Sequence, residues 1–253
     1  MGSKDLGRFL FELASDERLA ILESISVKPR KHAEIARTLS MTGSETTRHL
    51  NRLIGAGLVT KDPEGRFVPT GLAEALQAGL PLLEFLTDRR PYLLGHRVSV
   101  LEPPFLERLG ELRRATFELG TYQVVAVQES SLRTARRRIW VVTEQRFEQA
   151  LPILREKAAQ AADVRVIRSR RFLEDERRSR RDVSRNFPVR VLPEVPLFLA
   201  VLDDRAGICL PSNDGKVDMA TMLLATDADG CRWAEDLFLS LWNRAAVWHA
   251  PLG

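Results

Sequence analysis

The 253-residue sequence is poor in the side chains that build metal sites. It contains two cysteines, Cys209 and Cys231, and four histidines. The cysteines are 22 residues apart and form no CxxC pair, so the clustered ligands of a zinc site are missing. We therefore expect two buried, reduced thiols, and neither a metal ion nor another cofactor.

Long hydrophobic runs are also missing. The sequence has no stretch of about 18 uncharged apolar residues, so we expect no membrane-spanning helix. The segment MGSKDLGRFLFELASDERLA is charged from Lys4 onward and lacks the apolar core of a signal peptide. We expect a cytoplasmic protein without a membrane partner.

Common catalytic motifs are absent as well. The sequence contains no GxSxG, P-loop or GxGxxG pattern. Asp203 and Asp204 are a pair of carboxylates, but neighbouring residues on a strand point to opposite faces and do not form an acid/base pair. We therefore expect no catalytic residues and a protein that is not an enzyme.

The net charge of +4 is unevenly distributed. Residues 1–70 hold 11 basic and 9 acidic side chains, and residues 71–118 hold 6 and 7. Residues 119–190 hold 17 and 9, whereas residues 191–253 hold 4 and 9. These values are compatible with a nucleic-acid partner, but total charge alone does not indicate one.

Apolar residues at helical spacing mark the beginning of the chain. They predict helices over residues 5–26, 33–39 and 44–56. Ser15 precedes two acidic residues and can cap a new helix, which would divide the first segment in two. Ser44 is the predicted N-cap of the third helix, and Gly57 suits the C′ position behind it.

The pattern then changes to that of a β-hairpin. Residues 58–61 and 66–70 are strand-like and flank the turn sequence DPEG. The order of helices, turn and hairpin predicts a winged helix-turn-helix domain over residues 1–70.

The rest of the chain reads as a connector and a second domain. Residues 71–118 are predicted to be a helical connector with possible dimer contacts, a kink or restart at Pro81, and a helix over residues 104–118. Residues 119–253 alternate between strands and helices, which predicts an α/β domain with a mixed sheet. Strands are expected at residues 139–143, 164–167, 189–192, 197–202 and 206–210, with a strand or short helix at 219–225. The overall fold class is therefore α+β.

One polar face of the predicted third helix suits the major groove. Thr46, Leu50, Leu53 and Ile54 form its apolar side. The residues predicted to contact DNA are Ser44, Glu45, Thr47, Arg48, Asn51 and Arg52 on the helix, with Lys61 and Arg66 beside the wing turn. Arginine can bond guanine and asparagine can bond adenine there. His49 is compatible with a phosphate contact or with a half-buried structural role.

The stretch HAEIARTLSMTGSETTRHLNRLIGAGLVTKDPEGRFVPTGLAEAL resembles the winged-helix domains of ArsR-like and MarR-like prokaryotic regulators over about residues 16–76. The resemblance implies binding to double-stranded DNA. ArsR relatives often bind metal through cysteine or histidine, but residues 1–118 contain no cysteine, so we do not expect this property.

The segments PPFLERLGEL, RRRIWVVTE, FPVRVLPEVPLFLAVLDDRAGICLP and WAEDLFLSLWNRA resemble an archaeal regulator family. The family's C-terminal domain is named after the regulator of methanogenesis and filament formation. The resemblance implies a degenerate phospholipase D-like fold that senses an effector or dimerises. A catalytic phospholipase D-type enzyme needs His-x-Lys, and none of the four histidines is followed by lysine two residues later.

Two groups of residues in the second half have more than one interpretation. Trp233, Phe238, Trp242 and Trp248 fit a core better than a ligand pocket. A cluster of arginines could contact an anionic ligand or DNA, or could be a solvated segment paired with nearby acids. Its members are Arg168, Arg170, Arg171, Arg177, Arg178, Arg180, Arg181 and Arg185.

The sequence thus predicts a homodimeric, sequence-specific transcriptional regulator that binds half-sites about one helical turn apart, with a second domain that responds to a small-molecule effector or helps to hold the dimer. An interaction or scaffold protein that retains the winged-helix fold is the alternative. A phosphodiesterase is disfavoured because it lacks His-x-Lys. No ligand-binding residue in the second domain can be named from the sequence.

Overall fold

The computed structural model describes residues 3–146, 149–178 and 187–248. The chain divides into two compact units, Met1–Leu80 and Pro81–Gly253. This boundary falls inside the predicted connector at residues 71–118, and the three-part division stays a prediction. No described helix is long and apolar enough to cross a membrane.

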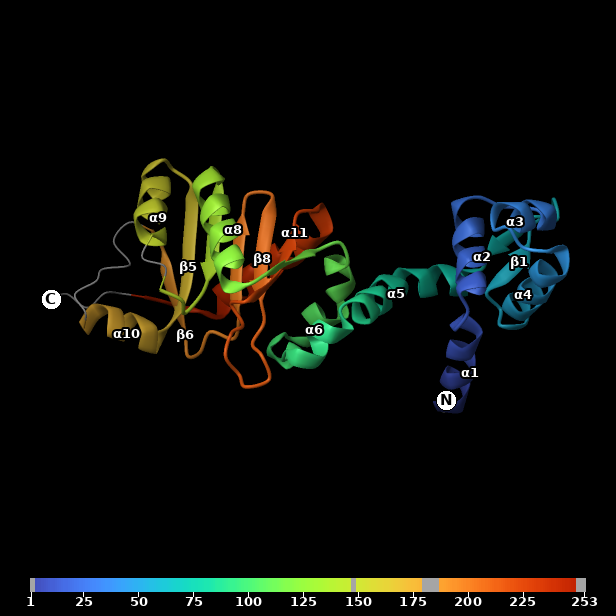
Figure 1. The fold of residues 1–253 in the computed structure, drawn as a ribbon, viewed down its shortest axis with the longest axis horizontal. Helices are drawn as coiled ribbons and strands as arrows, with labels where there is room; N and C mark the ends of the chain where they lie inside the picture. The colour runs from blue at the N-terminus through green and yellow to red at the C-terminus, as the bar shows by residue number, and fades with distance from the viewer. Residues whose placement is uncertain (1–2, 147–148, 179–186, 249–253) are drawn as a thin grey trace. The chain divides into compact units, whose positions relative to one another are not determined.

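The N-terminal unit has the predicted order of helices followed by a hairpin (Figure 1). Its elements are α1 Ser3–Leu13, α2 Asp16–Val27, α3 His32–Thr38, α4 Gly43–Gly55, β1 Val59–Lys61, β2 Phe67–Pro69 and the first part of α5 Gly71–Asp88. The predicted break at Ser15 is confirmed, because the Ser15 hydroxyl caps α2 by accepting the backbone N–H of Arg18. The predicted cap at Ser44 is wrong: α4 begins at Gly43 and its N-cap is Thr42.

The core of this unit forms where α2, α3 and α4 meet the hairpin. Ile21, Ile35 and Leu53 are among its fully buried side chains. The predicted apolar side of α4 needs one correction, since Ile54 is 43% exposed and His49 is buried instead. Gly57 follows the helix with φ of +73°, the left-handed conformation that glycine adopts easily at C′.

The C-terminal unit is built on one eight-stranded mixed sheet with the order β10-β6-β5-β4-β7-β8-β9-β3. The strands are β3 Thr116–Leu119, β4 Arg138–Val142, β5 Asp163–Ser169, β6 Val189–Leu192, β7 Phe198–Leu202, β8 Arg205–Cys209, β9 Thr221–Ala225 and β10 Ala246–Val247. β4, β5 and β6 are parallel, and the other neighbours are antiparallel. The predicted α+β class with a mixed C-terminal sheet is confirmed.

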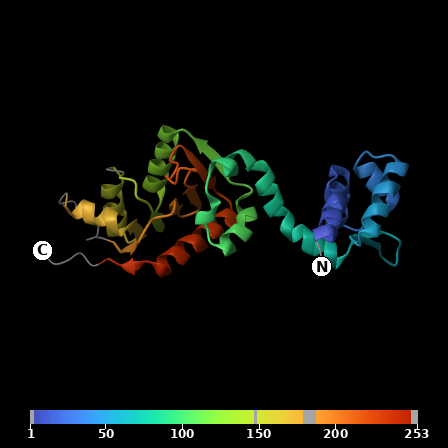
Figure 2. The same cartoon turned by 90° about the horizontal axis from the view of Figure 1, so that it is seen from below.

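Helices cover both faces of this sheet. α8 Thr121–Thr134 and α9 Ala150–Ala159 lie on one face, and α11 Ala228–Arg244 lies on the other (Figure 2). Successive residues of a strand point to opposite faces of the sheet. Ile139 therefore packs on the α8 side, and Trp140 packs on the α11 side. Trp233, Phe238 and Trp242 belong to the α11-side core, which confirms their structural interpretation. Cys209 and Cys231 are buried and free, as predicted.

Two local predictions in this unit are wrong. The helix expected over residues 104–118 is broken into α7 Pro103–Glu107, the 3₁₀ helix η2 Leu109–Leu112 and β3. Gly110 lies there against α5, and a Cβ at this position would stand 2.6 Å from the backbone N of Leu82. Asp203 lies between the predicted strands at residues 197–202 and 206–210, in the β7–β8 turn with φ of +52°, so the prediction that Asp203 and Asp204 are neighbours on one strand is wrong.

The remaining short elements are α6 Arg90–Gly95, η1 Val98–Val100 and α10 Arg170–Arg178. α6 and α7 pack on the α11 side through Tyr92 and Phe105. α10 follows β5 directly and contributes Leu173 to the core on the opposite face. The segment at residues 219–225 is predicted from the sequence to be a strand or a short helix. It contains the strand β9, which begins two residues later than the predicted segment.

Candidate nucleic-acid interface

The N-terminus of α4 is fixed by a capping box. The Thr42 hydroxyl accepts the backbone N–H of Glu45 at 3.2 Å, and the Glu45 carboxylate accepts the backbone N–H of Thr42 at 2.9 Å. Each side chain therefore satisfies a backbone donor that the first helical turn leaves open. The Thr42 hydroxyl also donates to the Glu45 carboxylate at 2.7 Å, and this bond, together with the bond from the Thr42 backbone N–H, holds the pKa of Glu45 below its usual value. Glu45, predicted to contact DNA, is thus committed to the start of the helix.

The middle of the exposed face of α4 carries three predicted site residues. Thr46, Leu50 and Leu53 are buried, and at 3.6 residues per turn the side opposite them holds Ser44, Arg48 and Asn51. These three exposed side chains form the surface that we call the reading face of α4. Thr47 and Arg52 lie on its two flanks.

Thr47 is tied to the neighbouring helix. Its hydroxyl lies 2.9 Å from Nε2 of His32 at the start of α3 and donates to the backbone carbonyl of Gly43 at 2.9 Å. The contact between His32 and Thr47 joins the two helices of the helix-turn-helix on their exposed side. Thr47 therefore has a positioning role in addition to the predicted contact.

Arg52 is paired with α1. Its Nη2 and Nε lie 2.6 and 2.8 Å from the two carboxylate oxygens of Glu12, and its guanidinium is 5.4 Å from the centre of the Phe11 ring. The hydrogen bond from Arg52 lowers the pKa of Glu12. The charge of Arg52 is thus neutralised within the domain.

Arg48 has a different environment. Its Nη2 lies 3.3 Å from Nε2 of His49, and no carboxylate among the described residues pairs with it. His49 is 7% exposed, which favours its structural role, and its Nδ1 has no hydrogen-bond partner in the described part of the chain. Arg48 is therefore the uncompensated cation of the reading face.

The wing carries the last two predicted residues. Lys61 on β1 is exposed, with its Nζ 5.0 Å from the centre of the Phe67 ring. Arg66 is held by Asp62 at 2.6 Å and by Glu64 at 3.0 Å across the turn. Lys61 remains available to a phosphate, whereas Arg66 stabilises the turn itself.

The sequence did not reveal the acidic partners of these cations. Glu12 lies 40 residues before Arg52, and no local spacing links them. Asp62 is four residues from Arg66 and could have been recognised as its partner from the turn sequence alone.

The structure divides the arginine cluster of the second domain. Arg170 and Arg171 are exposed on α10, and Arg178 lies 3.6 Å from Asp175. Arg168 lies on β5 instead and faces inward, so the cluster is not one solvated segment. Arg180, Arg181, Arg185 and the side chain of Arg177 lie outside the described residues.

Comparison with known families accounts for both parts of the chain. Residues 15–61 match the family described as bacterial regulatory protein, arsR family. Residues 121–244 match the family described as methanogenesis regulatory protein FilR1, middle domain. The chain is a DNA-binding transcriptional regulator with an ArsR-type winged helix-turn-helix and a FilR1-type regulatory domain. No curated protein gives a significant match to the regulator.

Three solved structures resemble the regulator distantly. TrmBL2, an archaeal chromatin protein, has a TM-score of 0.40 at 12% identity, covering 92% of this chain and 94% of that one. Nuc from Salmonella typhimurium, a phospholipase D family member, has a TM-score of 0.40 at 9% identity, covering 54% of this chain and 100% of that one. HmgR from Pseudomonas aeruginosa has a TM-score of 0.27 at 14% identity, covering 89% and 95%. Similarity at this level is too distant to assign a fold or a function.

Both matched families describe regulatory proteins rather than enzymes. Among the residues described by the structure, no group of three His, Cys, Asp or Glu side chains is placed to hold a metal ion.

Proposed function

We propose that the regulator recognises a specific double-stranded DNA sequence by placing the reading face of α4 in the major groove. The observation that carries the proposal is that Arg48 and Asn51 are three residues apart and are exposed on the same side of α4. Arginine bonds guanine through two donors, whereas asparagine bonds adenine through one donor and one acceptor. Lys61 on the wing adds a phosphate contact that fixes the register.

The proposal is tested with DNA selected by the full-length protein from fragmented genomic DNA. Binding of the selected duplex and of a random duplex is measured by fluorescence anisotropy. The Arg48→Ala/Asn51→Ala variant is expected to bind the selected duplex no better than the random one, with its circular dichroism spectrum unchanged. If the double variant retains the preference, α4 is not the reading element. If the wild type shows no preference for any fragment, the winged helix serves another kind of contact.

We further propose that two copies bind a site with two-fold symmetry. Exposed leucines support this: Leu6 and Leu10 on α1 are 59% and 47% exposed, and Leu83 and Leu86 on α5 are 47% and 40% exposed. Apolar side chains grouped on a helix surface are typical of a contact with another protein surface. Sedimentation equilibrium tests the stoichiometry, and a monomer at all concentrations, with and without DNA, would exclude a dimer.

The α/β domain supplies the regulatory input in this proposal. An effector alters DNA binding only if it binds one conformation of the regulator better than another. We also infer that the domain has no phosphodiesterase activity, because no histidine of the chain stands in a His-x-Lys motif.

A further inference from the structure

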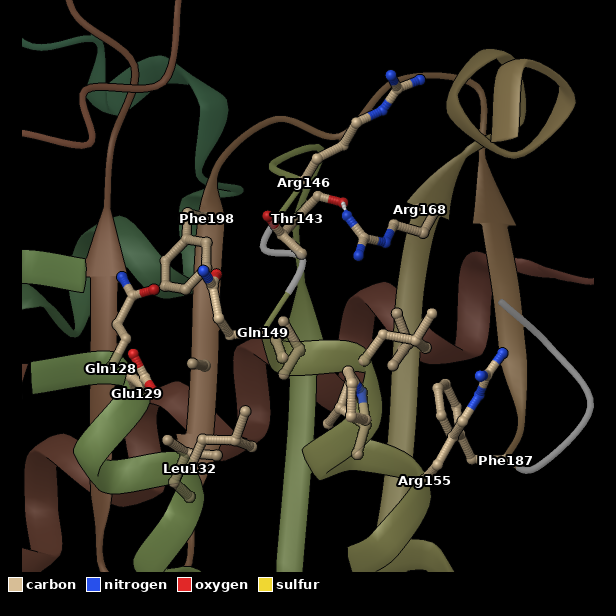
Figure 3. Close-up of a pocket in the computed structure, with 18 of the residues that line it drawn as sticks. Gln128, Glu129, Leu132, Thr143, Arg146, Gln149, Arg155, Arg168, Phe187 and Phe198 are labelled. Atoms are coloured by element: carbon tan, nitrogen blue, oxygen red, sulfur yellow. Dashed lines mark hydrogen bonds between the residues drawn. The ribbon is translucent and has the colours of Figure 1, made fainter. Parts of the chain in front are cut away.

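The C-terminal unit contains a cavity of about 380 Å³ between its sheet and the helices α8, α9 and α10 (Figure 3). This volume lies within the range of about 300–1,000 Å³ that is usual for small-molecule sites. Most of the lining is apolar, including Leu132, Val141, Leu154, Val166, Ala200 and Leu202. Such a surface offers water few hydrogen-bond partners, so the cavity suits the apolar part of a ligand.

One cation is built into the upper wall of the cavity in the view of Figure 3. Arg168 extends from β5 toward Thr143, and its Nη1 donates to the backbone carbonyls of Thr143 at 3.0 Å and Gln145 at 2.8 Å. Its Cζ lies 4.3 Å from the centre of the Phe172 ring, which holds the guanidinium plane from the side of α10. Burial lowers the pKa of Arg168 to about 10, so the group is still charged at neutral pH.

The charges of Glu176 and Glu144 act on Arg168 from nearby, but neither carboxylate forms an ion pair with it. The other charged groups at the cavity include two ion pairs: Arg146 with Glu176 at 2.8 Å and Glu129 with Arg133 at 2.7 Å. Among the residues that the structure describes, no carboxylate lies within ion-pair distance of Arg168, and its buried Nε has no hydrogen-bond partner. A desolvated donor without a partner is costly, and a bound anion would remove this cost.

The direction of the unused donors defines the kind of anion. Nη1 is occupied by the two carbonyls, which leaves the edge formed by Nε and Nη2. In this protein the same edge of Arg52 binds both oxygens of Glu12, and that of Arg108 binds both oxygens of Glu111. A planar carboxylate fits this edge with two parallel hydrogen bonds.

We propose that the cavity binds a small amphipathic monocarboxylate, with its carboxylate on the Nε–Nη2 edge of Arg168 and its hydrocarbon body among the aliphatic residues between α8, α9 and the sheet. Binding rests on the cavity alone. Its consequence for DNA binding rests on the proposed function, with the carboxylate as the effector of the regulatory domain.

Isothermal titration calorimetry of the full chain with octanoate tests the binding step, and 1-octanol serves as the uncharged probe of equal length. Octanoate is expected to bind at one site per chain, and octanol about 10- to 100-fold more weakly, because it cannot accept the paired charge-assisted hydrogen bonds. Equal binding of the two probes, or no binding of octanoate, would overturn the proposal.

Two variants locate the site. Arg168→Met is expected to abolish the preference for octanoate over octanol, while Arg165→Met, on the opposite face of the same strand, preserves it. Should Arg168→Met fail to fold, Ala200→Phe decides the question: it fills the cavity, leaves Arg168 in place and is expected to abolish binding of both probes. Octanoate binding that survives Ala200→Phe would place the ligand elsewhere.

The Arg48→Ala/Asn51→Ala variant separates this inference from the proposed function. It is expected to bind octanoate like the wild type, since the cavity lies wholly within the C-terminal unit. Loss of octanoate binding in this variant would contradict the independence of the two sites, whatever its effect on DNA.

Discussion

Arg52 on α4 and Glu12 on α1 form a two-point ion pair, with Nη2–Oε1 at 2.6 Å and Nε–Oε2 at 2.8 Å. Glu12 thereby neutralises the charge of Arg52, which the helical pattern alone predicts to contact DNA. The reading face is consequently narrower than the sequence suggests, and its uncompensated charge is Arg48.

Release of Arg52 should strengthen binding to any duplex. In Glu12→Gln the carboxylate no longer competes with DNA for the guanidinium, so we expect tighter binding to both selected and random DNA. One additional phosphate contact should steepen the dependence of log K on log salt by about 0.9. A salt titration by fluorescence anisotropy measures this slope.

Glu23→Gln is the matched control, because it removes the same charge from an exposed position on α2. It should change affinity less than Glu12→Gln and leave the salt slope unchanged. Identical slopes for the two variants would mean that Arg52 does not reach a phosphate when it is released.

The capping box gives a second prediction. Thr42→Ala removes the hydroxyl that accepts the Glu45 N–H, and loss of such a cap costs about 0.5–2 kcal/mol. Amide hydrogen exchange should accelerate at residues 43–46, where the first turn of α4 loses its acceptor. Thr42→Ser retains the hydroxyl and should keep wild-type protection. Unchanged exchange in Thr42→Ala would show that the helix start is held by other contacts.

The turn between β7 and β8 gives a pH-dependent prediction. Burial alone would raise the pKa of Asp203, but the backbone N–H groups of Arg136, Arg137 and Arg138 donate to its carboxylate and lower it. A carboxyl whose pKa is lower in the folded state stabilises the fold at pH values above its ordinary pKa. This contribution is lost as the pH falls through the lowered value.

Asp203→Asn should therefore lower the free energy of unfolding at pH 7 by about 1–3 kcal/mol and weaken its acid dependence. Urea titration followed by tryptophan fluorescence measures this directly, because all four tryptophans lie in the C-terminal unit. The control is Asp204→Asn, whose side chain is 79% exposed and should matter little. Equal effects of the two substitutions would contradict the assigned role of Asp203.

Periodicity predicted the elements whose burial repeats regularly. The winged helix could be predicted from the helical spacing around Leu50 and Leu53 and from the turn residues of the hairpin, and the central strands from β-branched runs such as residues 139–142. The region at residues 104–118 could not be predicted in this way. Its conformation depends on the close approach of Gly110 to α5, a contact between segments distant in sequence.

The candidate nucleic-acid interface, like the fold, could be predicted only in part. Exposure of Ser44, Arg48 and Asn51 is a consequence of the helical repeat. The engagement of Arg52 by Glu12 and the inward direction of Arg168 are not, because both depend on where other elements place their side chains. Composition alone does not distinguish Arg168, which faces a cavity, from the other arginines of residues 168–185.

The reading face is tested most directly by Arg48→Lys, which keeps the charge and removes the planar fork that bonds guanine. Affinity for the selected duplex and for a random duplex is measured across the same salt series. We expect a selectivity ratio reduced by about 5- to 150-fold, with affinity for random DNA and the salt slope nearly unchanged. A selectivity ratio equal to that of the wild type would contradict the assignment of α4 as the helix that reads the sequence.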